Sequence, residues 1–201
     1  MKITYLGHSC FLIEGAAGRL VLDPFEPGSV PGRELPELEA DCVLCSHGHA
    51  DHGAAERVKL SGRPHGYTVE AVHSFHDGER GALRGENLIH IVSAEGLRIA
   101  HLGDLGHELD AEQISRLGKL DVLLIPVGGY YTIDAAGAAA VADALGARIT
   151  VPMHYRGEGF GYDVICTLDS FTALRDNVRY ARTSSFDPAE YTAPVTLVLE
   201  A

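Results

Sequence analysis

The sequence predicts a strand-rich α/β domain. Short apolar runs separated by glycine-containing turns fill its first half, and apolar runs alternate with helical patterns in its second half. Apolar residues make up 46% of the chain and charged residues 22%, as in an ordinary soluble globular protein. No linker, low-complexity run or charge block divides the chain, so we expect one domain over residues 1–201.

Apolar runs bounded by turn residues predict a series of strands before the first helix. We expect these strands at residues 2–6, 10–14, 19–23, 41–45, 69–75, 88–94 and 97–102. Residues 24–36 are rich in proline and glycine, which predicts a loop that could border a site. Asp23, at the end of the third strand, is either a turn residue or a partner of residues in such a site.

The second half predicts helices that alternate with strands. Asp110 can cap a helix that carries Gln113 at its third position, and Gly118 is a natural end for it. An apolar stripe predicts a second helix over residues 134–145. A third helix is expected at residues 168–175, and further strands are expected at 121–126, 147–153 and 195–200.

Composition and charge exclude several classes of partner. The formal net charge of −12 argues against a nucleic acid polymer held by general electrostatics. No stretch of 18 or more apolar residues predicts a membrane span. The first residues carry one charge and no long apolar core, unlike a secretory signal, so we expect a cytoplasmic protein.

The chain has four cysteines, two of which form a C-x-x-C pair at Cys42 and Cys45. This pair lies in the strand expected at 41–45, where residues three apart point to opposite faces. Such an arrangement is poor for chelation, and buried reduced thiols are the favoured interpretation over a zinc or redox pair.

Four side chains that can bind a metal follow this strand within six residues: His47, His49, Asp51 and His52. Imidazole nitrogens and carboxylate oxygens are the ligands expected for zinc, iron or manganese. A tight loop lets the first two project together while the last two turn toward an adjacent point, so one loop can serve two metals. The alternative is a polar, solvated loop that merely contains histidines.

The same chemistry recurs downstream, in His76-Asp77, Gly103-Asp104 and Met153-His154. Each pair lies at the carboxyl end of an expected strand, where ligands on a rigid sheet would converge. Alone, each would be an ordinary turn residue or a hydrogen-bonded histidine. Together with the first cluster, they indicate a metal site.

Several motifs resemble the metallo-β-lactamase superfamily. Residues 46–52 match its H-x-H-x-D-H motif, His101-Leu102-Gly103-Asp104 resembles its G-D motif, and residues 121–129 with 151–154 resemble its C-terminal half. The resemblance extends from about residue 3 to residue 155. It implies a four-layer αββα sandwich with a dinuclear metal site along one edge of the two sheets.

The resemblance also implies a ligand set. One metal would be held by His47, His49 and His76, the other by Asp51, His52 and His154, with Asp104 bridging both. The metals would be zinc or manganese, with iron or nickel as further possibilities. His73 competes with His76 for the third histidine position, but His76 is preferred because it falls at the end of its strand.

Two such cations would lower the pKa of a bridging water, so that a hydroxide acts as nucleophile. No Gly-x-Ser-x-Gly element competes for that role. By the resemblance, Asp51 both ligates a metal and orients the water. His8 and His107 are candidates for the acid that protonates the leaving group, or else ordinary polar residues.

Tyr131 and Arg156 are expected to hold substrate, because Tyr131 follows a Gly-Gly turn and Arg156 lies beside His154. An arginine beside a metal suits a phosphate or carboxylate. Within the superfamily the chain resembles the compact branch that includes ascorbate-6-phosphate lactonase. We therefore expect a metal-dependent hydrolase of a small anionic substrate, either a phosphodiester or a phosphorylated lactone or ester.

Three alternatives remain to be weighed. β-Lactam hydrolysis is disfavoured because no export signal is visible. RNA cleavage is disfavoured because the span from Asp104 to His154 is too short for the inserted domain of the processive nucleases, although short nucleotides stay open. A non-enzymatic metal-binding or interaction protein is disfavoured because all seven ligand positions carry metal-binding residues.

A homo-oligomer is also possible, through apolar residues near Phe160 and Tyr162.

Overall fold

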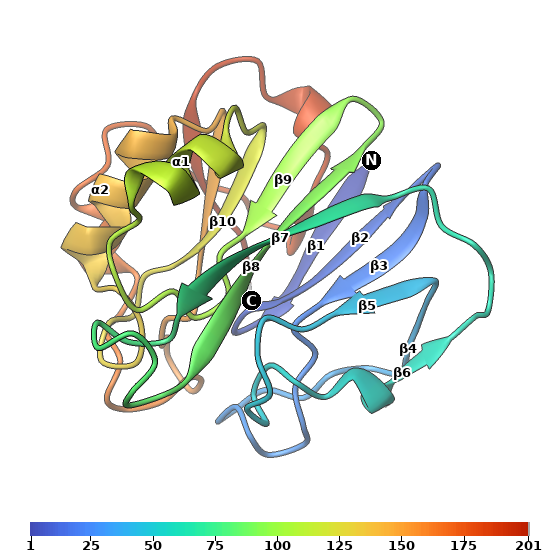
Figure 1. Ribbon diagram of the computed structural model, residues 1–201, viewed down its shortest axis with the longest axis horizontal. Helices are drawn as coiled ribbons and strands as arrows, with labels where there is room; N and C mark the ends of the chain where they lie inside the picture. Colours follow the sequence, from blue (N-terminus) through green and yellow to red (C-terminus); the bar gives the residue numbers. More distant parts are fainter. Residues whose placement is uncertain (201) are drawn as a thin grey trace.

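Two β-sheets stacked on one another form the centre of the protein (Figure 1). The computed structural model describes residues 1–200. Side chains from both sheets fill the space between them, among them Ile13 and Leu22 from the smaller sheet and Ile99, Leu124 and Val151 from the larger one. Alternate residues of these strands point into this layer, which is why the apolar runs of the sequence become strands.

The smaller sheet has five strands, in the order β13-β1-β2-β3-β5. Its strands are β1 (Lys2–Gly7), β2 (Cys10–Gly15), β3 (Gly18–Leu22), β5 (Cys42–Leu44) and β13 (Ser185–Phe186). Neighbours are antiparallel except β3 and β5, which are parallel. The chain can therefore leave β5 at the same end at which it leaves β3.

The larger sheet has seven strands, in the order β12-β14-β11-β10-β9-β8-β7. They are β7 (Thr68–Phe75), β8 (Glu86–Ala94), β9 (Leu97–His101), β10 (Val122–Pro126), β11 (Ile149–Met153), β12 (Val178–Tyr180) and β14 (Val195–Val198). β9, β10 and β11 are parallel, and β7 points the same way because both β7 and β9 are antiparallel to β8. The carboxyl ends of β7, β9 and β11 therefore meet at one edge.

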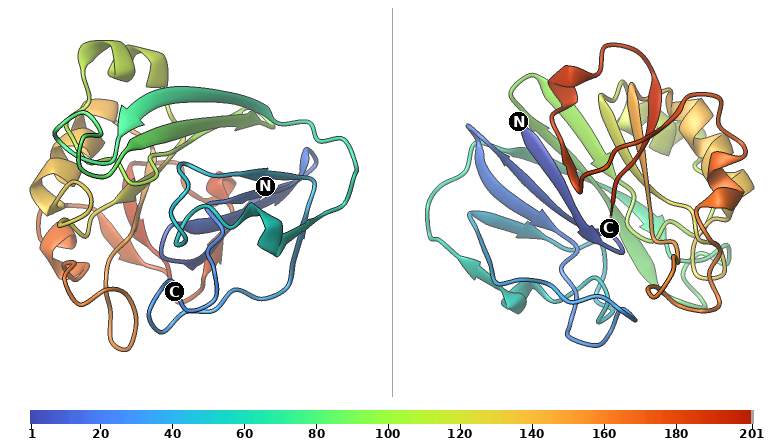
Figure 2. Two further views of the ribbon diagram at one scale, coloured as in Figure 1. Left: turned by 60° about the horizontal axis from the view of Figure 1, so that its bottom comes forward. Right: turned by 180° about the vertical axis from the view of Figure 1, so that it is seen from behind.

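Helices cover the outer face of the larger sheet (Figure 2). They are α1 (Ala111–Leu117), α2 (Ala135–Leu145) and the short α3 (Asp169–Thr172). The expected cap of α1 is present: the Asp110 carboxylate accepts from Gln113 N, and the Gln113 side chain accepts from Asp110 N. No helix within residues 1–200 is long and apolar enough to cross a membrane.

The outer face of the smaller sheet has a different cover. A two-stranded ribbon of β4 (Leu38–Ala40) and β6 (Val58–Leu60), the 3₁₀ turn η1 (Ala55–Arg57) and the loop after β3 pack over it. Phe25 and Val30 from that loop are buried there. The mixed α/β fold class is confirmed, but this fourth layer is a ribbon and loop in place of the α-helices implied by the resemblance.

Residues beyond the last expected helix contribute to both sheets. β12 and β14 pair in the larger sheet and β13 pairs with β1, while the 3₁₀ turn η2 (Pro188–Glu190) lies between β13 and β14. The expected helix over residues 168–175 is shorter in the structure, because Leu168 at its start provides no capping side chain. The short strands β4, β6, β12 and β13 were not predicted, since two or three residues show no alternation.

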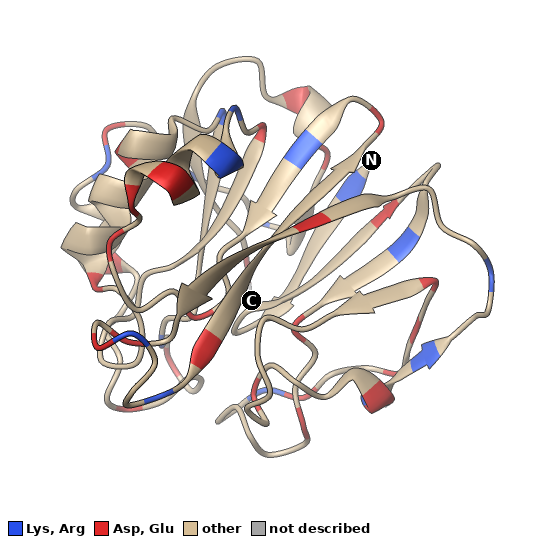
Figure 3. Cartoon of the chain, viewed as in Figure 1, with Lys and Arg blue, Asp and Glu red and all other residues tan. Residues whose placement is uncertain are grey.

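Charged side chains lie on many separate elements (Figure 3). One ion pair joins distant segments: Arg148 Nη2 donates to Asp121 Oδ1 at 2.9 Å, while Arg148 Nη1 donates to the carbonyl oxygens of Pro188 and Tyr191. Asp121 Oδ2 also accepts from Arg98 N at 3.0 Å. Burial opposes the ionised form of Asp121, but the hydrogen bonds from Arg148 and Arg98 outweigh it and lower the pKa of this carboxyl.

Substituting Asp121→Asn is expected to lower the free energy of unfolding by roughly 0.5–1 kcal/mol at pH 7, the range for a solvent-screened pair. A carboxyl whose pKa is lowered in the folded state stabilises above its unfolded pKa of about 3.9 and loses that effect as pH falls further. Urea titrations at pH 7 and pH 3 check this, with the more exposed Asp143→Asn as control. An equal deficit at both pH values would contradict it.

Candidate metal centre

The metal-binding residues predicted from the sequence meet at the edge where the strands end. His76 follows β7, Asp104 follows β9 by three residues, and His154 follows β11. The loop that carries His47 to His52 follows β5 of the smaller sheet. Because the carboxyl ends of β7, β9 and β11 lie at the same edge, residues far apart in the sequence become neighbours.

The first group consists of His47, His49 and His76, each of which offers a ligand atom within 4.8 Å of the others. Their ring centroids lie 4.7 to 5.2 Å apart. His76 is buried, His47 is half-buried and His49 is exposed. This group therefore opens to solvent on the His49 side.

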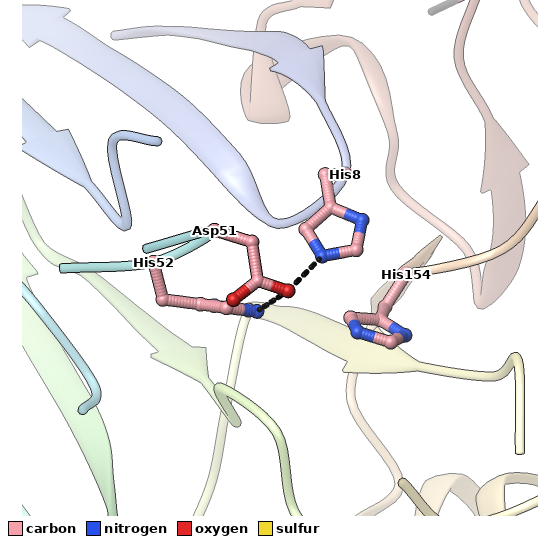
Figure 4. A group of neighbouring side chains, drawn as sticks. All are labelled: His8, Asp51, His52 and His154. Atoms are coloured by element: carbon pink, nitrogen blue, oxygen red, sulfur yellow. Dashed lines mark hydrogen bonds and ion pairs between the residues drawn. The ribbon is translucent and has the colours of Figure 1, made fainter. Parts of the chain in front are cut away.

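The second group consists of His8, Asp51, His52 and His154, whose ligand atoms also lie within 4.8 Å of one another (Figure 4). All three histidines are buried. The Asp51 side chain is 17% exposed and receives the Tyr162 hydroxyl at 3.1 Å on Oδ2. Only Asp51 gives this group a face toward solvent.

Asp104 lies between the two groups. Its Oδ2 is 3.2 Å from His76 Nε2 of the first group and 3.2 Å from His154 Nε2 of the second, and its Oδ1 is 3.2 Å from His52 Nε2. Burial opposes the ionised form of Asp104, but His154 and His52 outweigh this effect and hold the pKa of the carboxyl well below its usual value. One ionised carboxylate thus contacts both groups.

Several buried polar atoms in the cluster have no hydrogen-bond partner, among them His47 Nε2, His52 Nε2 and Asp104 Oδ1. Leaving such atoms desolvated without partners is unfavourable. Burial, with the neighbouring His52, lowers the pKa of His47 to about 3, so its imidazole stays in the neutral form that binds metals. The residues present therefore fit divalent cations held by nitrogen and oxygen ligands.

A glycine allows Asp104 to reach this position. Gly103 has φ +54°, and a Cβ on it would lie 2.3 Å from Asn87 Oδ1 and 2.4 Å from Ser46 Cβ. Asn87 Oδ1 accepts from Asp104 N at 2.9 Å, and its amide donates to Ser74 Oγ and Leu102 O. Only glycine fits here, which gives the Gly-Asp pair a steric reason.

Asp23 orients the loop ligands from behind. Its Oδ2 accepts from His52 Nδ1 at 2.8 Å and from Ser46 Oγ at 2.6 Å, and its Oδ1 accepts from Ser46 N at 2.7 Å. Burial opposes its ionisation, but His101, His52 and Ser46 outweigh this and lower its pKa to about 2. With Nδ1 donating to Asp23, His52 directs its Nε2 at Asp104 and the cluster.

The structure distinguishes His73, in β7, from His76, directly after β7, as the third histidine ligand. His73 is 48% exposed on its side chain and pairs with Glu86 at 3.3 Å, away from the cluster. His76 Nδ1 donates to Tyr131 O at 3.1 Å, which leaves Nε2 to face Asp104. Strand alternation places His73 on the solvent side, so the geometry favours His76 as the ligand.

A cleft of about 310 Å³ opens over the cluster. It is lined by His49, Asp51, His76, Leu83, Arg84, Asp104, Tyr131 and Tyr162. The Arg84 guanidinium lies 5.7 Å from the centre of the Tyr131 ring. Asp77 fixes the loop that carries Arg84, since its carboxylate accepts from the backbone N–H of Glu79, Gly81, Leu83 and Arg84.

Two residues expected at the site from the sequence lie outside the cleft lining. Both ring nitrogens of His107 bond to the main chain, Nε2 accepting from Phe75 N and Nδ1 donating to Glu108 O. Arg156 is exposed and its Nε donates to Ile165 O at 2.8 Å. His107 is therefore not placed to protonate a leaving group, nor Arg156 to bind substrate.

Other expectations are corrected by the surroundings of single residues. His8 does not line the cleft but lies beneath Asp51, with Nε2 3.3 Å from Asp51 Oδ2. Phe160 packs under the Arg33 guanidinium at 3.9 Å, and the Tyr162 hydroxyl donates to Ser29 O or Asp51. Phe160 and Tyr162 themselves therefore pack against neighbouring side chains, while Val164 close by is exposed, and an oligomer interface in this region stays a prediction.

Arg84 and Tyr162 had no sequence signal as site residues. Arg84 lies in a loop whose sequence has no helical or strand periodicity. Asp77, directly after His76, indicates only that a turn begins there. Tyr162 is far from every motif and reaches the site because it packs against His8 and Tyr131, with ring centroids 5.7 Å from each.

Comparisons with known proteins agree with this geometry. Residues 2–154 match the family model described as a beta-lactamase superfamily domain. A UPF0173 metal-dependent hydrolase of Archaeoglobus fulgidus is 33% identical over 194 residues, covering 77% of this chain and 83% of that protein. A UPF0173 metal-dependent hydrolase of Thermococcus kodakarensis is 33% identical over 192 residues, covering 77% and 84%.

Solved structures resemble the whole chain. A Thermotoga maritima protein assigned as a zinc-dependent hydrolase of the metallo-β-lactamase superfamily aligns with TM-score 0.80 and 33% identity, over 99% of this chain and 98% of that one. An isothiocyanate hydrolase from Delia radicum gut bacteria aligns with TM-score 0.62 and 14% identity, over 86% and 91%. The second likeness is one of fold alone.

Proposed function

Because the chain belongs to the metallo-β-lactamase superfamily and is a metal-dependent hydrolase, we propose that it hydrolyses a small anionic ester, either a phosphodiester or a phosphorylated lactone or ester. The relatives described above are named only as metal-dependent hydrolases, so the substrate class is argued from the cleft. That argument rests on Arg84.

The carrying observation is an unpaired cation in the wall of the cleft. Arg84 faces a cleft whose other wall is formed by His49, Asp51, His76 and Asp104. Among residues 1–200 no carboxylate forms an ion pair with its guanidinium. A guanidinium with free donors suits the oxygens of a phosphate or carboxylate, which supports an anionic substrate.

The size of the cleft and the charge of the chain support a small substrate. A volume of about 310 Å³ lies at the lower end of the range for small-molecule sites, about 300–1,000 Å³. Lysine and arginine are scattered among many elements, and the net charge is −12 (Figure 3). A nucleic acid polymer would find no continuous basic track, whereas a short nucleotide fits the same chemistry.

Bound divalent cations would supply Lewis acidity and a lowered pKa for water. Asp51 lines the cleft and lies within ligand distance of His8 and His52, which supports a role for its carboxylate in orienting an attacking water. Burial opposes its ionisation, but His8 and His52 outweigh this and lower the pKa of Asp51 below its usual value. The Tyr131 and Tyr162 side chains complete the lining of the cleft.

We further propose two cations per chain, zinc or manganese, with iron or nickel as alternatives. The support is the presence of two ligand groups with Asp104 between them. A cytoplasmic location is supported by the four unpaired cysteines among residues 1–200, since oxidising compartments favour disulfides. Nothing in the site requires a second copy of the chain, and a homo-oligomer stays an open prediction.

Replacing Arg84 by alanine is expected to raise KM for anionic substrates about 10–100-fold, the effect of losing a charge-assisted hydrogen bond. The values of kcat and of KM for a neutral activated ester are expected to change little. Kinetics with an activated phosphodiester, a phosphorylated sugar lactone and the neutral ester measure this. The protein loaded with zinc or manganese is used, with Asp51→Ala as the inactive reference.

Arg156→Ala is the matched control, because it removes the same cation from an exposed position outside the cleft. It is expected to leave KM for every substrate unchanged. Equal KM changes for charged and neutral substrates in Arg84→Ala would contradict an anionic substrate class. If the wild type hydrolysed neither anionic substrate, both proposed bond types would be wrong.

A further inference from the structure

His8 has no place in the ligand set implied by the sequence, yet it belongs to the second group of the site. We propose that His8 is a further protein ligand of the cation held by Asp51, His52 and His154, in addition to the Asp104 carboxylate that contacts both groups. The second position of the metal centre then has more protein ligands than the first, which faces the cleft. This inference concerns metal binding and does not depend on the substrate class.

The backbone holds His8 in a conformation that is uncommon for a residue with a side chain. Its φ is +54°, in the left-handed region, at the turn between β1 and β2. Its carbonyl oxygen accepts two hydrogen bonds at 2.9 Å, from the Tyr5 hydroxyl and from His154 N. Such strain persists where the surroundings fix it and is concentrated at functional sites.

The side chain of His8 is fully buried and directed at the other members of its group. Figure 4 shows the four side chains converging from three separate parts of the chain. The His8 ring centroid lies 4.2 Å from that of His154 and 5.1 Å from that of His52. The ligand atoms of the four side chains lie within 4.8 Å of one another, close enough to share one ion.

The distances within the group suit a shared cation better than a hydrogen bond. His8 Nε2 is 3.3 Å from Asp51 Oδ2, and His52 Nε2 is 3.8 Å from the same oxygen. An N–H···O hydrogen bond is usually about 2.9–3.0 Å long. Two ligand atoms that each lie about 2.1 Å from one cation are about 3.0–3.6 Å apart for angles of about 90–120° at the cation.

The position of the cleft gives independent support. Its lining includes His49 and His76 of the first group and Asp51 of the second, but not His8, His52 or His154. With His8, the second position has more protein ligands than the first, whose His49 and His76 face the cleft, and a catalytic cation is one that keeps a position open to substrate. Three nitrogens beside the carboxylate oxygens also favour zinc, cobalt, nickel or iron over magnesium and calcium.

The test compares cobalt binding by the wild type and by His8→Asn. Asparagine tolerates positive φ and is too short to reach the cation, so the turn is kept while the ligand is lost. Metal content is measured after dialysis of the cobalt-loaded protein against increasing chelator, together with the visible spectrum of bound cobalt. We expect the affinity of the tighter ion to fall about 100-fold, and its absorption bands to shift.

His90→Asn is the matched control. His90 is also buried, and its Nε2 bonds to Cys45 O at 3.0 Å, but it belongs to neither ligand group. The cobalt affinity and the visible spectrum of the His90→Asn variant are expected to equal those of the wild type. His8→Gly is a second variant that removes both the ring and the backbone strain, and added imidazole is expected to restore the spectrum.

An unchanged chelator profile and spectrum in both His8 variants would overturn the proposal. Loss of turnover with unchanged metal binding would also overturn it, because His8 would then act on protons and not on the metal. Neither result would argue against an anionic substrate. That proposal is tested separately by substituting Arg84, which leaves all metal ligands in place.

Discussion

Replacing Asp104 by asparagine is expected to lower turnover more than about 100-fold, because even the outer partners of metal ligands are worth about 10–100-fold. The Asp104 carboxylate contacts His52, His76 and His154 at 3.2 Å each, so it belongs to both ligand groups. Asparagine has the same shape as aspartate, but its amide has one oxygen in place of two and carries no negative charge. Metal analysis is expected to show the loss of at least one cation per chain.

Asp110→Asn is the control for this variant. It makes the same chemical change six residues away, at the N-cap of α1, where asparagine caps as well as aspartate. Its turnover and metal content are expected to match the wild type. Wild-type metal content and turnover in Asp104→Asn would show that the two groups do not share this carboxylate.

Replacing Asp23 by asparagine is expected to weaken metal binding about 10–100-fold although Asp23 touches no cation position. Its two oxygens accept three hydrogen bonds, from Ser46 N, Ser46 Oγ and His52 Nδ1. Asparagine would place an N–H₂ group against donors, and His52 would lose the carboxylate that orients its ring toward the cluster. Competition with a chromophoric chelator measures the affinity.

The same variant is expected to lose about 1–3 kcal/mol of stability without metal, the effect of an unsatisfied buried donor. Asp121→Asn is the comparison, because its carboxylate is only partly buried and lies far from the cluster. An affinity in Asp23→Asn equal to that of the wild type would mean that Ser46 and the backbone alone orient His52.

The sequence predicted the parts of the site that are local or that follow strand ends. His47, His49, Asp51 and His52 lie in one short loop, so their spacing alone indicated a metal site. His76, Asp104 and His154 were found because each follows an apolar run, and the parallel directions of β7, β9 and β11 bring those ends together. The Asp110 cap of α1 followed from local pattern in the same way.

The sequence did not predict features that depend on chain path. Arg156 is only two residues beyond His154, but His154 has φ +53° and Arg156 turns away to bond Ile165 O. Arg84 enters the cleft because Asp77 binds four backbone N–H groups of its loop. The cover of the smaller sheet is built from strands of three residues and a loop, which leave no period to detect.

Anomalous diffraction from crystals of the zinc-loaded protein, recorded on both sides of the zinc absorption edge, tests the metal centre most directly. Two peaks are predicted beside Asp104, one among His47, His49 and His76 and the other among Asp51, His52 and His154. Absence of zinc peaks at these residues, or peaks at other positions only, would contradict the assignment of this cluster as the hydrolytic metal centre.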